Sequence, residues 1–235
     1  MIKNLLITSI VGGLIGLDRT AIFQTMISQP IVAAPVMGLL LGNFAYGIAV
    51  GIVLQLIWLP SLQIGAAIVC NSTLASVLVT ASTIEVSNSL SQPDGSFTSI
   101  AAFSIFLGLP LLIFEQKLDI LVRKANAFWV KEAEKLITDG KISLIGITNL
   151  SGCIFFFIKN FIFLLVSTIV ITTVISKSYF FLPVNFNEGF KLFFVLMPLL
   201  GIAVVLESVL VKRNYIYFFS GILTTIVLKL ILENR

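Results

Sequence analysis

Residues 28–67 read SQPIVAAPVMGLLLGNFAYGIAVGIVLQLIWLPSLQIGAA and lie inside a longer run, residues 20–84, that contains no Asp, Glu, Lys or Arg. A spanning helix needs about 20 apolar residues, so this run has room for roughly three crossings, or for two crossings and shorter hairpins. Glycine and proline are frequent in it, which is typical of closely packed membrane helices with breaks. The stretch therefore predicts an all-α, polytopic membrane protein.

The composition of the whole chain agrees with a membrane protein. Of the 235 residues, 58% are hydrophobic and 11% are charged, whereas a typical soluble domain has about 25% charged residues. A mean hydropathy of +1.09 leaves too little polar surface to cover a soluble core. The net charge of +4 is not gathered into a basic patch with aromatic residues, so we expect no nucleic acid partner.

Charge divides what we expect to be one integral membrane domain, residues 1–235, into three regions. Residues 1–114 form a Gly/Pro-rich core with the first spans, beginning with a retained first helix. Residues 115–141 hold eleven charged side chains, six of them basic, and apolar residues at three- and four-residue spacing. This pattern predicts an amphipathic cytoplasmic segment, which either docks a soluble partner or lies on the bilayer surface.

The third region, residues 142–235, alternates apolar runs with isolated charges and holds the C-terminal spans. We expect spans near 142–176, 190–211 and 214–232, the first of them either continuous or broken at Lys159–Asn160. A polar turn at Pro93-Asp94-Gly95 separates the early spans. The whole chain is expected to have about seven to nine membrane segments, including broken or hairpin helices.

One helix break is visible in GIVLQLIWLPSLQIGAA, residues 51–67. Gln55 and Trp58 are three residues apart and share a helix face. Pro60 ends that helix, and Ser61 can cap the next one. A broken helix at membrane depth is stable where it is buried in protein or lines a wet cavity, and transporters build substrate sites at such breaks.

The uncharged run also contains amides and hydroxyls, which cost several kcal/mol in hydrocarbon unless their hydrogen bonds are satisfied. Amides both donate and accept, and an aromatic ring packs on the apolar face of a sugar, so the group suits a neutral polyhydroxylated solute. Each amide is equally open to bonding between helices. The candidate solute contacts are Gln24, Gln55, Trp58, Gln63, Asn71 and Ser72.

Catalytic and metal chemistry is not expected of this chain. Histidine is absent, which excludes a histidine phosphoryl carrier, a Ser-His triad and a histidine metal site. Cys70 and Cys153 have no CxxC spacing and are interpreted as small buried hydrophobic residues. Asp18 and Arg19, at the edge of the first apolar run, are interpreted as an interfacial ion pair or an orientation anchor. We assign no catalytic residue, cofactor or metal.

Three stretches resemble a known family: residues 16–67 (GLDRTAIFQTMISQPIVAAPVMGLLLGNFAYGIAVGIVLQLIWLPSLQIGAA), 124–145 (KANAFWVKEAEKLITDGKISLI) and 196–223 (LMPLLGIAVVLESVLVKRNYIYFFSGIL). They are similar to the IIC membrane subunit of the mannose/fructose/sorbose family of the bacterial phosphoenolpyruvate-dependent sugar phosphotransferase system. Mannose-branch members commonly carry arginine, aspartate and glutamate where this chain has Gln29, Asn43 and Gln55. These departures leave the identity of the sugar open.

The resemblance implies a non-catalytic, multi-pass subunit of the bacterial inner membrane that translocates a sugar. It implies a membrane partner, IID, in a trimer of IIC–IID pairs, with a transport core that moves against a scaffold like an elevator. A phosphorylated soluble IIB subunit then phosphorylates the sugar. Two alternatives are a divergent, non-transporting scaffold or sensor, and an ion channel or proton-coupled carrier. The carrier would need a buried carboxylate relay, which residues 20–84 lack.

Overall fold

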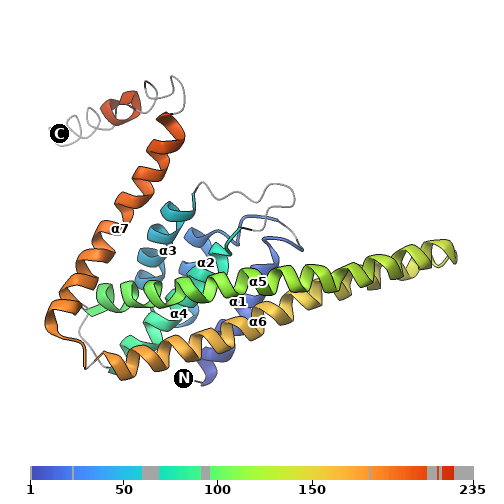
Figure 1. Cartoon of the computed structure of the whole chain (residues 1–235), viewed down its shortest axis with the longest axis horizontal. Coiled ribbons are helices and arrows are strands. Elements are labelled where there is room, and N and C mark those ends of the chain that lie inside the picture. Colours follow the sequence, from blue (N-terminus) through green and yellow to red (C-terminus); the bar gives the residue numbers. More distant parts are fainter. Residues whose placement is uncertain are drawn as a thin grey trace.

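The computed structural model describes residues 2–22, 24–59, 69–90, 96–179, 181–210, 216 and 219–224. Over these residues the chain is helical, as expected, with turns and short coils between the helices. Figure 1 shows their arrangement. In chain order the elements are α1 (Ile2–Leu17), α2 (Pro30–Leu40), α3 (Phe44–Trp58), α4 (Ser72–Leu90), α5 (Phe97–Thr138), the 3₁₀ turn η2 (Ile142–Leu144), α6 (Ile145–Ser178) and α7 (Val184–Leu210).

Helices α2 and α3 form a short, tight hairpin. Gly42 turns the chain with a φ of +87°, which an L side chain rarely adopts. The side chain of Asn43 then accepts a hydrogen bond from the N–H of Tyr46 and caps α3. A Cβ added to Gly47 would lie 2.5 Å from the carbonyl oxygen of Ala34. The glycines of this stretch therefore let the two backbones approach closely.

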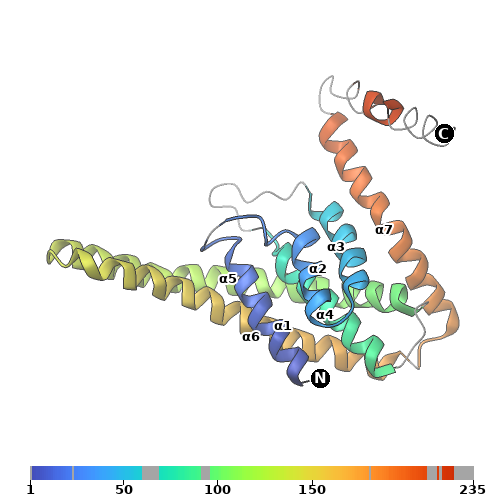
Figure 2. The ribbon, with the colours of Figure 1, turned by 180° about the vertical axis from the view of Figure 1, so that it is seen from behind.

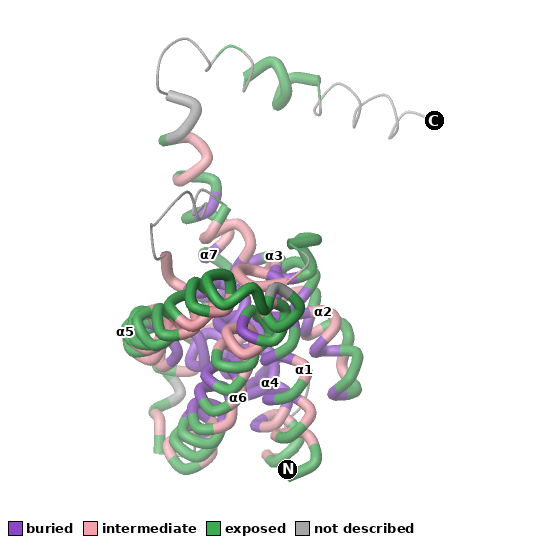
Figure 3. The backbone as a smooth tube through the Cα atoms, turned by 90° about the vertical axis from the view of Figure 1, so that its right-hand side faces the viewer, coloured by how far each residue is buried: buried purple, intermediate pink, exposed green. Residues whose placement is uncertain are grey.

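Helix α4 occupies the centre of the bundle and contacts α1, α2, α3, α5 and α6. It is buried on nearly all sides, and Figure 3 shows this buried interior surrounded by exposed outer helices. Leu74, Leu78 and Ile84 are fully buried in the apolar core. The same helix buries several serine and threonine hydroxyls, some of which bond to carbonyls of the preceding turn, as in Ser82 to Leu78.

Helices α5 and α6 form a long antiparallel pair whose outer halves extend beyond the other helices (Figures 1 and 2). The expected apolar span after residue 96 and the amphipathic segment 115–141 are largely one continuous helix, α5, which ends at Thr138. Helix α6 runs through Lys159–Asn160 without interruption. The broken alternative at this position was wrong, because both side chains bond inward from a regular helix.

Among the described residues, three helices are long and apolar enough to cross a membrane: α5, α6 and residues Asn185–Glu207 of α7. Helix α7 packs against α5 and α3, and its C-terminal end extends beyond them (Figure 1). Helices α1, α2 and α3 are apolar but shorter. Helix α3 ends at Trp58, shortly before Pro60, as the proline predicts. Pro60, Ser61, Gln63, the turn at residues 93–95 and most of the span expected at 214–232 lie outside the described residues.

Candidate functional site

Four helix ends meet at one end of the bundle. The residues just before α2 connect the end of α3 with the start of α4: the hydroxyl of Thr73 donates to the carbonyl of Ser28 at 2.6 Å, and Nε2 of Gln55 donates to Oε1 of Gln29 at 3.3 Å. The end of α1 joins them through Arg19, which bonds to the start of α4. Polar groups from distant parts of the sequence are thereby collected in one place.

The start of α4 is both polar and buried. Asn71 and Ser72 have 8% and 6% of their surface exposed. Asn71 precedes the first helical residue, and its Oδ1 accepts a hydrogen bond from the N–H of Leu74 at 3.2 Å. This bond satisfies one of the free N–H groups at a helix N-terminus, which is why Asn is a frequent N-cap. The helix start thus fixes the orientation of the Asn71 side chain.

Arg19 reaches the same helix start from the end of α1. One terminal nitrogen of its guanidinium donates to the hydroxyl oxygen of Ser72 at 2.6 Å, and the other donates to the carbonyl of Cys70 at 3.1 Å. Of the two interpretations of Asp18 and Arg19, the ion pair is wrong, because the two side chains bond to different partners. Arg19 is instead a contact between α1 and α4.

Asp18 organises the loop that follows α1. Its carboxylate accepts hydrogen bonds from the N–H and hydroxyl of Thr25 at 2.7 and 2.8 Å, and from the N–H of Ser28 at 3.0 Å. Burial of the carboxylate works against its charge, but these hydrogen bonds outweigh that effect and lower the pKa of Asp18 below its ordinary value. Asp18 therefore holds Ser28 in the position where its carbonyl accepts the hydrogen bond from Thr73 of α4.

The other predicted contacts are distributed unevenly around this cluster. Gln55 is engaged with the start of α2, since its Oε1 also accepts from the N–H of Ile31 at 3.3 Å. Trp58 is partly buried and packs against both apolar core clusters. Gln24 is exposed on the loop after α1, in a left-handed backbone conformation with φ of 54°. Asn71 and Ser72 are neighbours in the sequence, and the structure links Gln55 to this segment through the residues just before α2. It places Trp58 against the apolar core and leaves Gln24 apart from the cluster.

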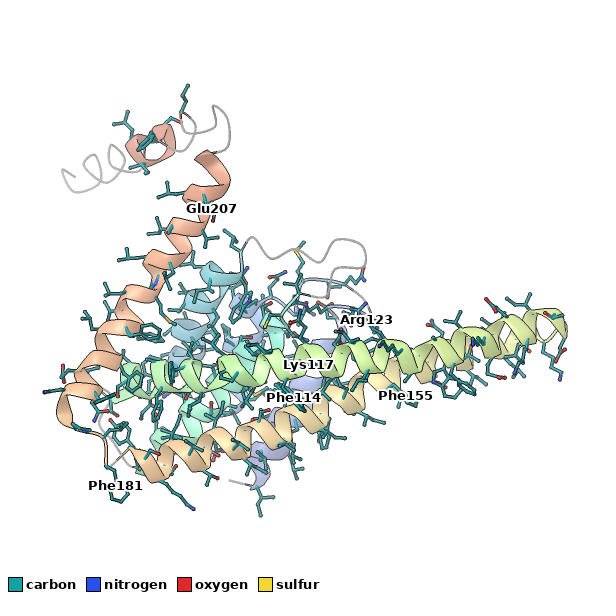
Figure 4. All side chains as sticks on the ribbon, viewed as in Figure 1. Phe114, Lys117, Arg123, Phe155, Phe181 and Glu207 are labelled. Atoms are coloured by element: carbon teal, nitrogen blue, oxygen red, sulfur yellow. The ribbon has the colours of Figure 1, made fainter. Side chains whose placement is uncertain are left out.

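A buried charged network beside Asn71 was not predicted from the sequence. Nζ of Lys159 donates to Oε1 of Glu115 at 2.5 Å and to Oδ1 of Asp119 at 3.0 Å. Glu115 also accepts a longer hydrogen bond, 3.5 Å, from Nδ2 of Asn71. Asp119 in turn binds Arg123, which is labelled in Figure 4 on α5, near where the helix pair leaves the bundle. The network joins α4, α5 and α6.

Among the described residues, no group of histidine, cysteine, aspartate or glutamate side chains is arranged to hold a metal ion. Cys70 and Cys153 are both free thiols of intermediate exposure. The described part of the site is therefore made of neutral amides and hydroxyls, one arginine, and the carboxylate of Glu115, which is ion-paired with Lys159. Such groups can bind a polar solute through hydrogen bonds.

The sequence profile of one protein family, described as the PTS system sorbose-specific IIC component, matches residues 1–233. The chain belongs to this family. It is therefore a multi-pass bacterial membrane protein and a IIC component of the sugar phosphotransferase system, a transport subunit that does not itself transfer the phosphoryl group. The family resemblance of the three quoted sequence stretches is confirmed.

Similar IIC components come from several bacteria. The sorbose-specific EIIC component of Klebsiella pneumoniae is 27% identical over 202 residues, covering 86% of this chain and 71% of that protein. The fructose permease IIC component of Bacillus subtilis is 23% identical over 195 residues, covering 83% and 68%. The mannose-specific EIIC component of Escherichia coli K12 is 30% identical over 124 residues, covering 53% and 42%.

Two solved structures share the fold. One, described only as a membrane protein, has a TM-score of 0.74 at 22% identity and covers 96% of this IIC chain and 87% of its own. The other is a complex of the mannose transporter ManYZ with microcin E492, with a TM-score of 0.59 at 20% identity, covering 96% and 86%. At these identities the likeness concerns the fold alone.

Proposed function

We propose that this IIC chain translocates a sugar across the bacterial inner membrane together with a IID subunit, and that a phosphorylated IIB subunit phosphorylates the sugar at the cytoplasmic face. Membership of the IIC family supports this proposal. The shared fold with ManYZ, which is described as a mannose transporter, is consistent with it. In the proposed complex, IIC–IID pairs form a trimer within the lipid bilayer, and a core moves against a scaffold.

The observation that carries the proposed sugar site is the unused bonding capacity at the start of α4. Asn71 donates one hydrogen to Glu115 and accepts one bond from Leu74, so one amide hydrogen and one lone pair remain for a ligand. Ser72 accepts from Arg19 and keeps its own hydroxyl hydrogen. A sugar hydroxyl both donates and accepts, so it can satisfy these groups, which are costly to leave unpaired when buried.

The remaining proposed contacts are Gln55, Gln63, Gln24 and Trp58. Gln55 supports the proposal because its hydrogen bonds to Gln29 and Ile31 connect it with the segment next to the α4 start. The same two bonds are also those expected of an amide that only joins two helices. In the proposed topology the chain forms seven to nine membrane segments. Residues 1–114 hold the transport core and the first spans, residues 115–141 lie on the cytoplasmic side, and residues 142–235 hold the C-terminal spans.

The test is uptake of radiolabelled mannose, fructose and sorbose by cells that express the chain with its IID and IIB subunits. Substitution of Asn71, Ser72 or Gln55 by Ala should lower uptake on the order of tenfold, the effect of losing one or two neutral hydrogen bonds. The matched control is Asn149→Ala, which removes an exposed amide on α6. If all three variants transport as well as the control, the site assignment is wrong.

Co-purification decides whether the chain works in a transport complex. A tagged IIC chain should retain the IID subunit in mild detergent, and the pair should bind one of the three sugars more tightly than the IIC chain alone. Failure to associate would contradict the proposed pairing. Association with no sugar binding and no uptake would instead favour the non-transporting scaffold.

A further inference from the structure

Charged side chains hold three consecutive residues at the start of α4. Arg19 bonds to the carbonyl of Cys70 and to the hydroxyl of Ser72, on either side of Asn71. The amide of Asn71 itself is bonded by the carboxylate of Glu115. Two charged groups, from the end of α1 and from α5, therefore converge on the backbone and side chains of this short segment.

Glu115 is fixed in place by a buried ion pair. Its side chain is 1% exposed, and its partner Lys159, at 2.5 Å, is 5% exposed. Asp119 provides Lys159 with a second carboxylate at 3.0 Å. Burying charges within membrane helices is expensive, and such residues usually serve a site or a path. Asp119 is also paired with Arg123 at 2.8 Å, so Glu115 is left as the carboxylate that pairs with Lys159 and contacts Asn71.

The chemistry of Glu115 gives it a specific effect on Asn71. An ionised carboxylate only accepts hydrogen bonds, so it selects the NH₂ group of the amide. The N–H of Leu74 only donates, so it selects the amide oxygen. Together the two bonds place the NH₂ group of Asn71 towards Glu115 and its oxygen towards the N–H of Leu74. Among the described contacts, no such bond joins Asp119 to Asn71.

We propose that Glu115, held by Lys159, is a positioning residue that fixes the amide orientation of Asn71 and so determines which hydrogen-bonding groups face the sugar. The sugar part of this inference rests on the proposed function. Lys159 fixes the carboxylate, the carboxylate fixes the amide, and the amide presents one donor and one acceptor. The segment from Cys70 to Ser72 should therefore loosen when Glu115 no longer accepts a hydrogen bond, whether or not a sugar is present.

The experiment uses Cys70 as a reporter in the full chain, co-expressed with the IID subunit in membrane vesicles. Cys153→Ser leaves Cys70 as the single thiol, and its rate of reaction with N-ethylmaleimide is measured per chain in the membrane. Three variants are compared: Glu115→Ala, Glu115→Gln and Asp119→Ala. Ala and Gln both remove the charge of Glu115, so an electrostatic effect on the thiol is common to both, and only Gln keeps an acceptor for Asn71.

Glu115→Ala should raise the labelling rate on the order of tenfold, because local opening of the segment exposes the thiol. Glu115→Gln should raise the rate only by the charge effect that both variants share, well below the rise in Glu115→Ala. Asp119→Ala, which removes the other carboxylate of Lys159, should stay close to the unmodified rate. Equal rates for Glu115→Ala and Glu115→Gln would overturn the proposal, and so would an equal effect of Asp119→Ala. These rates need no sugar, so they decide the positioning role even if the chain transports none.

A second pair of variants covers the case in which Glu115→Ala is not retained in the membrane. Asn71→Asp sets two carboxylates against each other and should raise the labelling rate of Cys70. In the double variant Asn71→Asp, Glu115→Gln, the new amide at position 115 can donate to the new carboxylate at position 71. The labelling rate should therefore return towards that of the unmodified chain. No recovery in the double variant would overturn the proposal.

Sugar kinetics provide the readout at the proposed site. For whichever of mannose, fructose and sorbose the unmodified chain transports, Glu115→Ala should raise the KM about tenfold, the effect of one misdirected hydrogen bond. Glu115→Gln should keep the KM near that of the unmodified chain. Asp119→Ala should leave the KM unchanged and alter only the amount of the chain in the membrane. Absence of uptake by the unmodified chain contradicts the proposed function and leaves the labelling result to decide the positioning role.

Discussion

The sharpest test of the packing is to remove the buried cation at the centre of the charged network. Lys159→Met leaves Glu115 and Asp119 with no ammonium group between them, although their side chains are only 1% and 10% exposed. Removing one partner of a buried ion pair costs about 3–5 kcal/mol, because an uncompensated charge stays in a poorly solvated place. For a chain of this size that loss corresponds to a fall in the thermal midpoint on the order of 10 °C.

The chain provides a matched control in the pair Lys191–Glu188. Its nitrogen and oxygen are 2.8 Å apart, a similar distance, but the two side chains are 38% and 63% exposed. Lys191→Met should leave the midpoint nearly unchanged, because solvent stabilises the remaining charge. The midpoint is measured by fluorescence-detected size-exclusion chromatography of the heated full chain in detergent.

Replacing Lys159, Glu115 and Asp119 together by neutral side chains of similar size distinguishes the effect of a buried charge on stability from the effect of lost packing. The triple variant Lys159→Met, Glu115→Gln, Asp119→Asn should recover most of the midpoint lost in Lys159→Met, because no buried carboxylate is left without a cation. Arg123 loses its partner Asp119 in this variant, but its side chain is 36% exposed to solvent. The reasoning is refuted if Lys159→Met and Lys191→Met lower the midpoint equally, or if the triple variant is no more stable than Lys159→Met alone.

Three further outcomes are expected. Gly47→Ala brings a methyl group 2.5 Å from a backbone carbonyl of α2 and should lower the stability by about 1–3 kcal/mol, seen as a lower midpoint, whereas Gly146→Ala meets nothing within 4 Å and should not. The lowered pKa of Asp18 stabilises the fold above the ordinary carboxyl pKa, so Asp18→Asn should lower the midpoint at pH 7, and the difference should shrink as pH falls below about 4. Gln29→Arg and Gln55→Glu should each reduce stability, and the double variant should recover part of the loss, as a double-mutant cycle would measure.

Much of the fold could be predicted from the sequence because its signals are local. Uncharged apolar runs predict membrane helices, and Pro60 predicts the end of α3 at Trp58. Asn71 could be singled out because an amide in an uncharged apolar run needs a hydrogen-bonding partner. Features that depend on how distant segments pack could not be predicted in this way. Residues 97–138 were divided where the composition changes, but a helix continues through a change from lipid-facing to polar surroundings as long as no residue breaks it.

The charged network was missed for the same reason. Glu115 begins a charged stretch whose pattern predicts an amphipathic segment, and Lys159 lies where the sequence allows either a continuous span or a break. One signal was available: Glu115, Asp119 and Arg123 are spaced four apart and lie on one helix face, close to buried Leu112. Nothing local indicates that this face meets Lys159, which is 44 residues from Glu115, because pairing between helices depends on how they pack.

The structure also changes the interpretation of two departures from the mannose branch. The resemblance implies arginine and glutamate at the positions of Gln29 and Gln55 in that branch, and taken singly each departure would be a lost charge. Their side chains are hydrogen-bonded to each other at 3.3 Å, between the start of α2 and the end of α3. An opposite-charge pair and an amide pair can both join these two helix ends, and each has a net charge of zero. If the two positions carry an arginine and a glutamate in mannose-branch members, as the resemblance implies, the two departures would compensate each other in charge. In this chain the amide pair keeps the contact between these two helix ends, next to Ser28, which is hydrogen-bonded to Thr73 of α4.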